Sequence, residues 1–199
     1  MKSYSKDTVN KIGNAAVYMC ERIPDMSKTK LLKLLYLLEE CSVKKFQTPF
    51  FGIDFEVWQA GPVAKDIFID LSDDYHSPSM LNEYLTVKTV RAAKDRFATY
   101  IFAKTNFSND EFSDNDMAIM DDVIKEYGNK TANCLVKLTH KKNTAWYAAA
   151  KENELLDRFN AKTKMSSDVP IDFGYYLSEC EKSKYLDTKE TWSAFDNLK

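Results

Sequence analysis

The sequence predicts a mainly α protein, a single compact helical domain with a small β-hairpin or short sheet. Three observations predict this fold class. Apolar residues repeat at helical spacing through most of the chain. One short stretch, residues 51–57, alternates apolar and polar side chains with a period of two, which is typical of a strand. The 199 residues, 44% of them hydrophobic, suffice for one core and are few for two.

The strongest helix signal lies in residues 27–46, which we expect to form a central buried helix. Its leucines recur three and four residues apart on one face, and more apolar residues cover much of the other side. A helix that is apolar nearly all round is buried nearly all round. The solvent-facing positions of this helix are expected to be its charged residues: Lys30, Lys33, Glu39 and Glu40.

A Gly-Pro pair follows the alternating stretch and predicts the start of another helix. Gly61 can serve as an N-cap, and Pro62 suits the first helical position. Val63, Ile67 and Leu71 then form the apolar stripe of a short helix. Residues 84–90 also alternate, and we expect them to pair with residues 51–57.

Other helices are expected before and after this central region. An apolar stripe over residues 9–23 predicts a first helix, and another is expected over residues 93–104. Ser113 with Asp116 forms a variant of the capping box, and Gly128 supplies a stop for the helix between them. Short helices are also expected near residues 132–138 and from residue 143.

The C-terminal part of the chain is more polar. Residues 151–169 are rich in charge and are expected to form a surface connector, and residues 183–199 a polar C-terminal tail. Between these segments, Asp168 can cap a helix that has Pro170 in its first turn. Leu177 and Cys180 are then expected to face inward.

Composition and motifs exclude several classes of protein. The net charge of −2 shows no basic excess, so a nucleic-acid partner is not expected. No apolar stretch is long enough to cross a membrane and no secretion signal is seen, so we expect a cytoplasmic protein with free thiols. The cysteines are far apart and form no CxxC pair: Cys20, Cys41, Cys134 and Cys180.

No metal site, cofactor or catalytic motif is expected either. The histidines are His76, in a polar turn, and His140, which with no cysteine pair make no zinc site. Phosphate-binding glycine loops and a nucleophile elbow are absent. His140 can hold a helix end through ring hydrogen bonds, which we favour, or act as a general base.

Three motifs together resemble the Panacea domain, also described as the SocA-like antitoxin domain. The resemblance covers most of residues 27–150, and family members often have Pro before the last Trp, where this chain has Ala145. The motifs are Lys33-Leu34-Leu35-Tyr36, then Trp58-Gln59-Ala60-Gly61-Pro62-Val63, and finally Thr139-His140 with Trp146.

The resemblance implies a bacterial or phage-associated antitoxin that neutralises a cognate toxin by contact, and not an enzyme. The toxin is then expected to be encoded by the adjacent gene, and an adaptor that delivers it to a protease is a variant of the same class. Trp58 either packs on the core beneath the Gly61-Pro62 turn or binds a partner, and both interpretations stay open. The candidate partner-binding residues are Trp58, Gln59, His140 and Trp146.

Two other functions remain alternatives at this stage. One is a small hydrolase that uses His140. The other is a weak nucleic-acid-binding regulator, for which Lys137, Lys141 and Lys142 provide a small basic patch.

Overall fold

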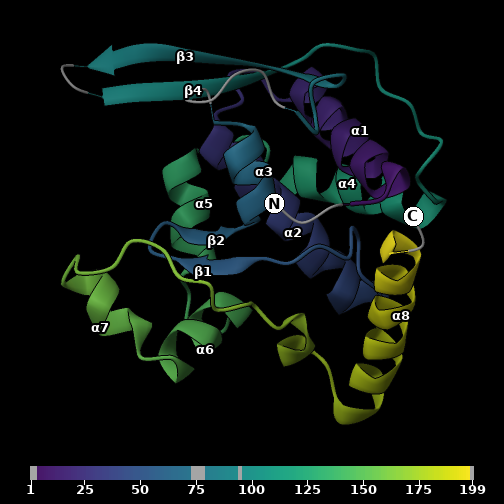
Figure 1. The fold of residues 1–199 in the computed structure, drawn as a ribbon, viewed down its shortest axis with the longest axis vertical. Helices are drawn as coiled ribbons and strands as arrows, with labels where there is room; N and C mark the ends of the chain where they lie inside the picture. The colour runs from purple at the N-terminus through teal and green to yellow at the C-terminus, as the bar shows by residue number, and fades with distance from the viewer. Residues whose placement is uncertain (1–3, 73–78, 94–95, 198–199) are drawn as a thin grey trace.

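The computed structural model describes residues 4–72, 79–93 and 96–197. Within these residues the chain is mainly α with two small antiparallel sheets, which confirms the predicted fold class. Figure 1 shows helix α2 (Lys28–Phe46) in the middle of the molecule, with the other helices and both sheets around it. The expected turn at His76 lies outside the described residues.

Helices α1 (Lys6–Arg22) and α2 follow the predictions closely. The side chains of Ser5 and Ser27 each accept a hydrogen bond from the main-chain N–H three residues on, which caps the two helices. Helix α1 ends just before Pro24, as expected. The leucines on both sides of α2 are at most 5% exposed, so α2 is the buried central helix that its composition indicates.

Three charged residues of α2 lie inside the core, where the sequence predicts solvent exposure. Lys33 and Glu39 are each 1% exposed, and Glu40 is 9% exposed. The prediction is wrong because burial of a charged group is tolerated when hydrogen bonds satisfy it. Each group has such a partner: the carbonyl of Pro62 for Lys33, the main-chain N–H of Phe51 for Glu39 and the hydroxyl of Tyr176 for Glu40.

Buried Glu39 makes the stability of the fold depend on pH. Burial is the main cause that raises the pKa of its carboxyl to about 7. The folded state therefore keeps a proton that the unfolded chain loses, and stability falls as the pH rises from about 4.5 to 7. Glu39→Gln cannot ionise but still offers Phe51 an acceptor. We expect E39Q to exceed wild type by about 3 kcal/mol at pH 8 and by far less near pH 4.5.

Urea unfolding followed by circular dichroism across this pH range measures the effect. The matched control is Glu190→Gln on exposed surface, which should leave the pH profile of wild type unchanged. Parallel profiles for wild type and E39Q would contradict the prediction.

Strands β1 (Glu56–Trp58) and β2 (Gly61–Val63) form a short antiparallel hairpin. Gly61 and Pro62 therefore begin a strand and not a helix, and α3 (Lys65–Asp70) starts only after them. The helix-start prediction is wrong because Gly61 has a φ of +94°, which turns the chain back onto β1. Of the predicted strand over residues 51–57 only the end is a strand, but its apolar positions are buried: Phe51, Ile53, Phe55 and Val57.

Strands β3 (Leu85–Ala93) and β4 (Arg96–Ala103) form a longer antiparallel ribbon, which we call the β3–β4 ribbon. Two predictions are therefore wrong: residues 84–90 do not pair with residues 51–57, and residues 93–104 are not helical. Apolar residues in this segment do recur at helical spacing. However, β-branched and aromatic residues dominate it, and these favour a strand.

Three further helices form as expected between residues 113 and 152. Helix α4 (Asp114–Tyr127) begins with the capping box of Ser113 and Asp116 and ends at Gly128. Helices α5 (Ala132–Thr139) and α6 (Ala145–Glu152) follow, each capped by a threonine side chain. A polar cap before each apolar run makes these helices predictable.

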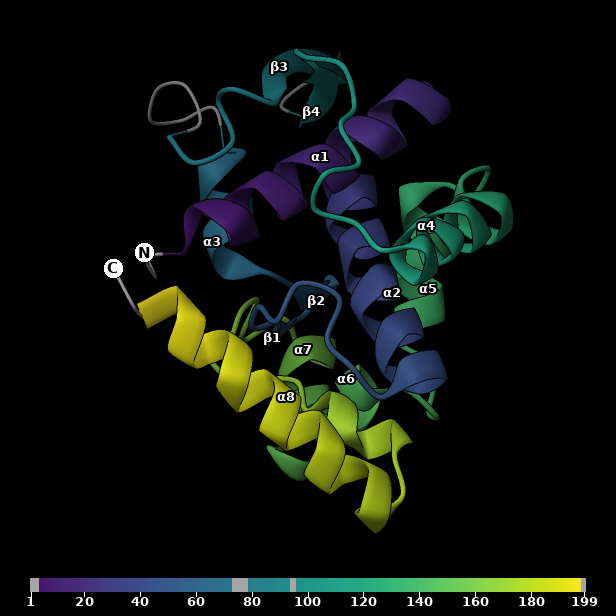
Figure 2. The same cartoon turned by 90° about the vertical axis from the view of Figure 1, so that its right-hand side faces the viewer.

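The remaining chain is more ordered than its polar composition suggests. Helix α7 (Leu155–Asn160) lies in the expected surface connector and buries Leu155 and Phe159. A short 3₁₀ helix, η2 (Phe173–Tyr176), leads to α8 (Glu179–Asn197). Figure 2 shows α8 along one flank of the molecule.

Two expectations for this region are wrong. The helix expected from Asp168 does not form, because Pro170 instead bridges to Glu56 of β1. Cys180 is exposed in the first turn of α8, not inward. The expected polar tail is helical through residue 197, with Tyr185 only 2% exposed.

Two other properties of the described part of the chain bear on its class. The four cysteines are free thiols, as predicted. None of the helices described is both long and apolar enough to cross a membrane.

Candidate functional site

Residues from all three sequence motifs meet at the turn between β1 and β2. Helix α2 contributes Lys33, the hairpin contributes residues 58–62, and His140 and Trp146 come from the end of α5 and the start of α6. We call this cluster the hairpin junction: Lys33, Trp58, Gln59, Gly61, Pro62, His140 and Trp146. Figure 1 shows the hairpin lying among α2, α5 and α6.

Lys33 connects the central helix to β2. Its Nζ donates a hydrogen bond of 2.7 Å to the main-chain carbonyl of Pro62. Burial lowers the pKa of the Lys33 amine to about 7, because the charged form loses its hydration. The side chain therefore serves as a buried donor that fixes the position of the strand.

Gly61 allows the chain to pass close to its neighbours. A Cβ added there would lie 2.8 Å from Oγ1 of Thr139 and 3.0 Å from Cε of Lys33. Both distances are shorter than ordinary van der Waals contact, and the positive φ also disfavours any other residue. Glycine is therefore required here for the backbone conformation and for the space.

His140 joins the end of α5 to the same turn. Its Nε2 lies 2.9 Å from the main-chain oxygen of Gln59, and its Nδ1 lies against the oxygen of Val136. Both neighbours are acceptors, so a protonated ring can donate to both at once and a neutral ring to one. These contacts support the structural interpretation of His140, because each ring nitrogen faces a main-chain oxygen.

Trp146 fills the space beneath the turn. It is 2% exposed, and its indole N–H donates a hydrogen bond of 3.1 Å to the carbonyl of Trp58. Its ring centroid is 3.9 Å from that of His140 and 6.2 Å from that of Phe159. Trp146 is therefore mainly a core residue of the junction.

Trp58 and Gln59 lie nearer the surface. The half-buried Trp58 ring packs edge-on against Phe68, with ring centroids 5.0 Å apart, and its indole N–H donates to Glu56. The Gln59 side-chain amide donates a hydrogen bond of 2.6 Å to the carbonyl of Phe159. Both side chains already have partners within the fold.

The segment after α7 extends the hairpin on its other side. The main-chain N–H groups of Val57 and Gln59 donate to the carbonyls of Val169 and Met165, each at 2.9 Å. The N–H of Ile171 donates to the carbonyl of Phe55 at 2.8 Å. The expected surface connector thus runs beside β1 as a hydrogen-bonded edge.

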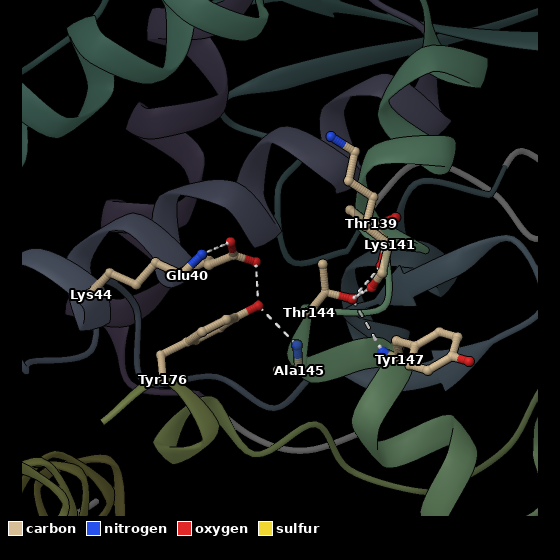
Figure 3. Close-up of polar contacts among 8 residues, drawn as sticks. All are labelled: Glu40, Lys44, Thr139, Lys141, Thr144, Ala145, Tyr147 and Tyr176. Carbon is tan, nitrogen blue, oxygen red and sulfur yellow. Dashed lines mark hydrogen bonds and ion pairs between the residues drawn. The ribbon is translucent and has the colours of Figure 1, made fainter. Parts of the chain in front are cut away.

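A second polar network fixes the turn between α5 and α6, as Figure 3 shows. The Tyr176 hydroxyl donates to Glu40 at 2.9 Å and accepts a hydrogen bond of 2.8 Å from the N–H of Ala145, while Lys44 pairs with the same carboxylate. Thr144 caps α6 by accepting from the N–H of Tyr147. A proline in place of Ala145 would have no N–H to donate.

A shallow surface pocket of about 370 Å³ adjoins the junction. Gln59 and His140 form part of its wall, while Trp58 does not line it. Residues of α6 and α7 complete the wall: Trp146, Tyr147, Leu156, Phe159 and Asn160. Of the four candidate partner-binding residues, Gln59, His140 and Trp146 therefore line this opening, although Trp146 is only 2% exposed.

The described residues show no arrangement typical of catalysis at the junction. The hydrogen bonds of His140 within this part of the chain go to main-chain oxygens and not to a carboxylate that could orient a general base. Among the same residues, no cluster of His, Cys, Asp and Glu could hold a metal ion. The geometry supports a structural use of these side chains.

Sequence reasoning missed Glu40, Thr144 and Tyr176, although they place the α5–α6 turn. Thr144 had a usable signal, since a threonine before an apolar run is a typical N-cap. Tyr176 had none, because its partner on α2 is 136 positions away in the chain.

A family model described as antitoxin SocA-like, Panacea domain, matches residues 31–147, which are 117 of the 199 residues. The chain belongs to this Panacea family. No curated protein and no solved structure matches it. The Panacea match contains the whole hairpin junction, whereas Phe159, Met165, Val169 and Tyr176, which support the junction, lie after its last residue.

Proposed function

We propose that this chain is an antitoxin that neutralises a cognate toxin by direct protein–protein contact. Membership of the Panacea family carries the proposal, since it gives an antitoxin-like character in general. The toxin would be the product of the adjacent gene, and the contact would cover roughly 800 Å² on each partner if it is of ordinary size. Delivery of the bound toxin to a protease is a further step that this contact would permit.

The geometry of the hairpin junction supports a binding role over an enzymatic one. Its most distinctive polar groups, the Lys33 amine and the His140 ring, are used on main-chain carbonyls. Trp146 is enclosed in the core. These residues hold the fold in shape, so the toxin would be contacted by other, exposed side chains, with Gln59 and His140 contributing at most through the adjoining pocket.

Co-expression with the product of the adjacent gene tests this function. The expected result is that the neighbour alone arrests growth, that this chain restores growth, and that the two proteins elute as one complex in size-exclusion chromatography. A neighbour that is harmless alone and forms no complex would overturn the proposal.

His140→Asn separates the structural use of His140 from catalysis. Asparagine can replace one of the two hydrogen bonds, so we expect a loss of about 1–2 kcal/mol in the free energy of unfolding and unchanged neutralisation of the toxin. Urea unfolding and the growth assay measure the two effects. If the wild-type protein consumed a substrate and the folded H140N variant did not, the result would instead show that the chain is an enzyme.

A further inference from the structure

The β3–β4 ribbon differs in charge from the rest of the chain. Residues 85–103 contain four Lys or Arg and one Asp, a net charge of +3. The whole chain has a net charge of −2, so the remaining residues carry −5. This asymmetry favours an anionic partner at the ribbon, because opposite charges steer association and set its orientation.

The ribbon also exposes large apolar side chains. Phe102 is 47% exposed and Phe97 is 70% exposed. Alternation along β4 puts Phe102 and Tyr100 on the face opposite buried Ile101. We call this the outward face; the paired residues that form it are Thr86 with Phe102, Lys88 with Tyr100 and Val90 with Ala98.

The base of the ribbon is held firmly on the helical body. The N–H of Ile101 donates to the carbonyl of Met26 at 2.8 Å, and the Tyr84 hydroxyl donates to Asn10 of α1 at 2.7 Å. The Tyr84 ring lies so close to α1 that a Cβ on Gly13 would be 2.4 Å from it. Both views place the ribbon at one end of the molecule (Figures 1 and 2), where these contacts anchor its base to the helices.

We propose that the outward face of the β3–β4 ribbon is the surface that holds the toxin. The proposal rests on the proposed antitoxin function and adds the site and the chemistry of the contact. The toxin would present an apolar depression for Phe102 and Tyr100, bordered by Asp or Glu side chains that pair with Lys88. Aromatic side chains beside a positive charge are typical of the energetic centre of a protein interface.

The arrangement of the cations favours a protein over a nucleic acid. Among the ribbon residues whose side chains the structure describes, Lys88 lies on the outward face and Arg91 on the other. A phosphate backbone is bound by several cations on one face. Lys88, set among the aromatic and aliphatic side chains of this face, instead fits a local acidic group on a folded partner.

Binding of the purified adjacent-gene product by variants of this chain tests the proposal. Lys88→Glu and Phe102→Ser should each raise Kd about 10-fold or more, with Lys88→Gln intermediate. Raising NaCl from about 0.05 to 0.5 M should weaken wild type more than K88E. The matched controls, Lys142→Glu and Leu186→Ser, are exposed elsewhere and should stay within about 2-fold. Circular dichroism verifies that each variant is folded.

The outcomes separate this proposal from the antitoxin function. A complex that forms equally well with wild type, K88E and F102S would overturn the ribbon surface and leave the function standing. No complex and no rescue of growth with wild type would remove both. Retention of a DNA duplex or single-stranded RNA by wild type at low salt, lost in K88E, would overturn the proposal in favour of a nucleic-acid surface.

Discussion

Trp146→Ala is expected to destabilise the fold by about 4 kcal/mol. The side chain is 2% exposed and packs between the rings of His140 and Phe159, so its removal leaves a cavity that rigid neighbours cannot fill. The change also leaves the carbonyl of Trp58 without the indole N–H that it accepts. Urea unfolding followed by circular dichroism measures the loss without relying on tryptophan fluorescence.

Trp146→Phe is the control that separates these two effects. It keeps most of the apolar volume and removes the N–H, so about 1–2 kcal/mol should be lost. A Trp146→Ala protein whose stability lies within about 0.5 kcal/mol of wild type, the range of a surface change, would contradict the packing described for the junction.

Gly61→Ala is expected to destabilise the fold by about 3 kcal/mol. The φ of +94° disfavours alanine, and its Cβ would meet Thr139 Oγ1 at 2.8 Å and Lys33 Cε at 3.0 Å. Backbone strain and overpacking each typically cost about 1–3 kcal/mol. The midpoint of urea unfolding measures the loss, and the drop should appear without a change in the slope of the transition.

A double-mutant cycle tests the steric part of this prediction. Thr139→Ala removes the closest contact, so the Gly61→Ala change should be less damaging in that background than in wild type. If the two changes are simply additive, the close approach does not contribute to the requirement for glycine.

The sequence predicts the helices with clear boundaries and a clear apolar face. Ser113 caps α4 as expected, and α2 begins directly after Ser27, at the start of the predicted central helix. Local signals of this kind act within a few residues, but those at Gly61-Pro62 and Asp168 do not start helices, because these segments pair with β1. The alternation of residues 84–90 correctly indicates a strand, β3, whereas the apolar residues of 93–104 fit a helical spacing as well as a strand. Which strands pair is decided by contacts distant in the chain.

The candidate site, too, is predictable from the sequence only in part. The motifs indicate which residues matter, such as Gly61 and His140, but not what these residues contact. Their partners are largely main-chain carbonyls, as in Lys33 with Pro62, and a carbonyl leaves no trace in the sequence. The burial of Glu39 and Glu40 was missed for a related reason, since an ionisable residue is expected outside unless its distant donor is known.

The hydrogen bonds between residues 55–59 and residues 165–171 affect how the family match should be used to choose fragment boundaries. A fragment shortened to residue 147 would deprive Val57 and Gln59 of their acceptors and Phe55 of its donor. It would also uncover Trp146, because Phe159 of α7, which stacks on it, would be missing. The limits of sequence similarity in this chain therefore do not coincide with the limits of cooperative folding, and recombinant fragments should retain the residues that follow the match.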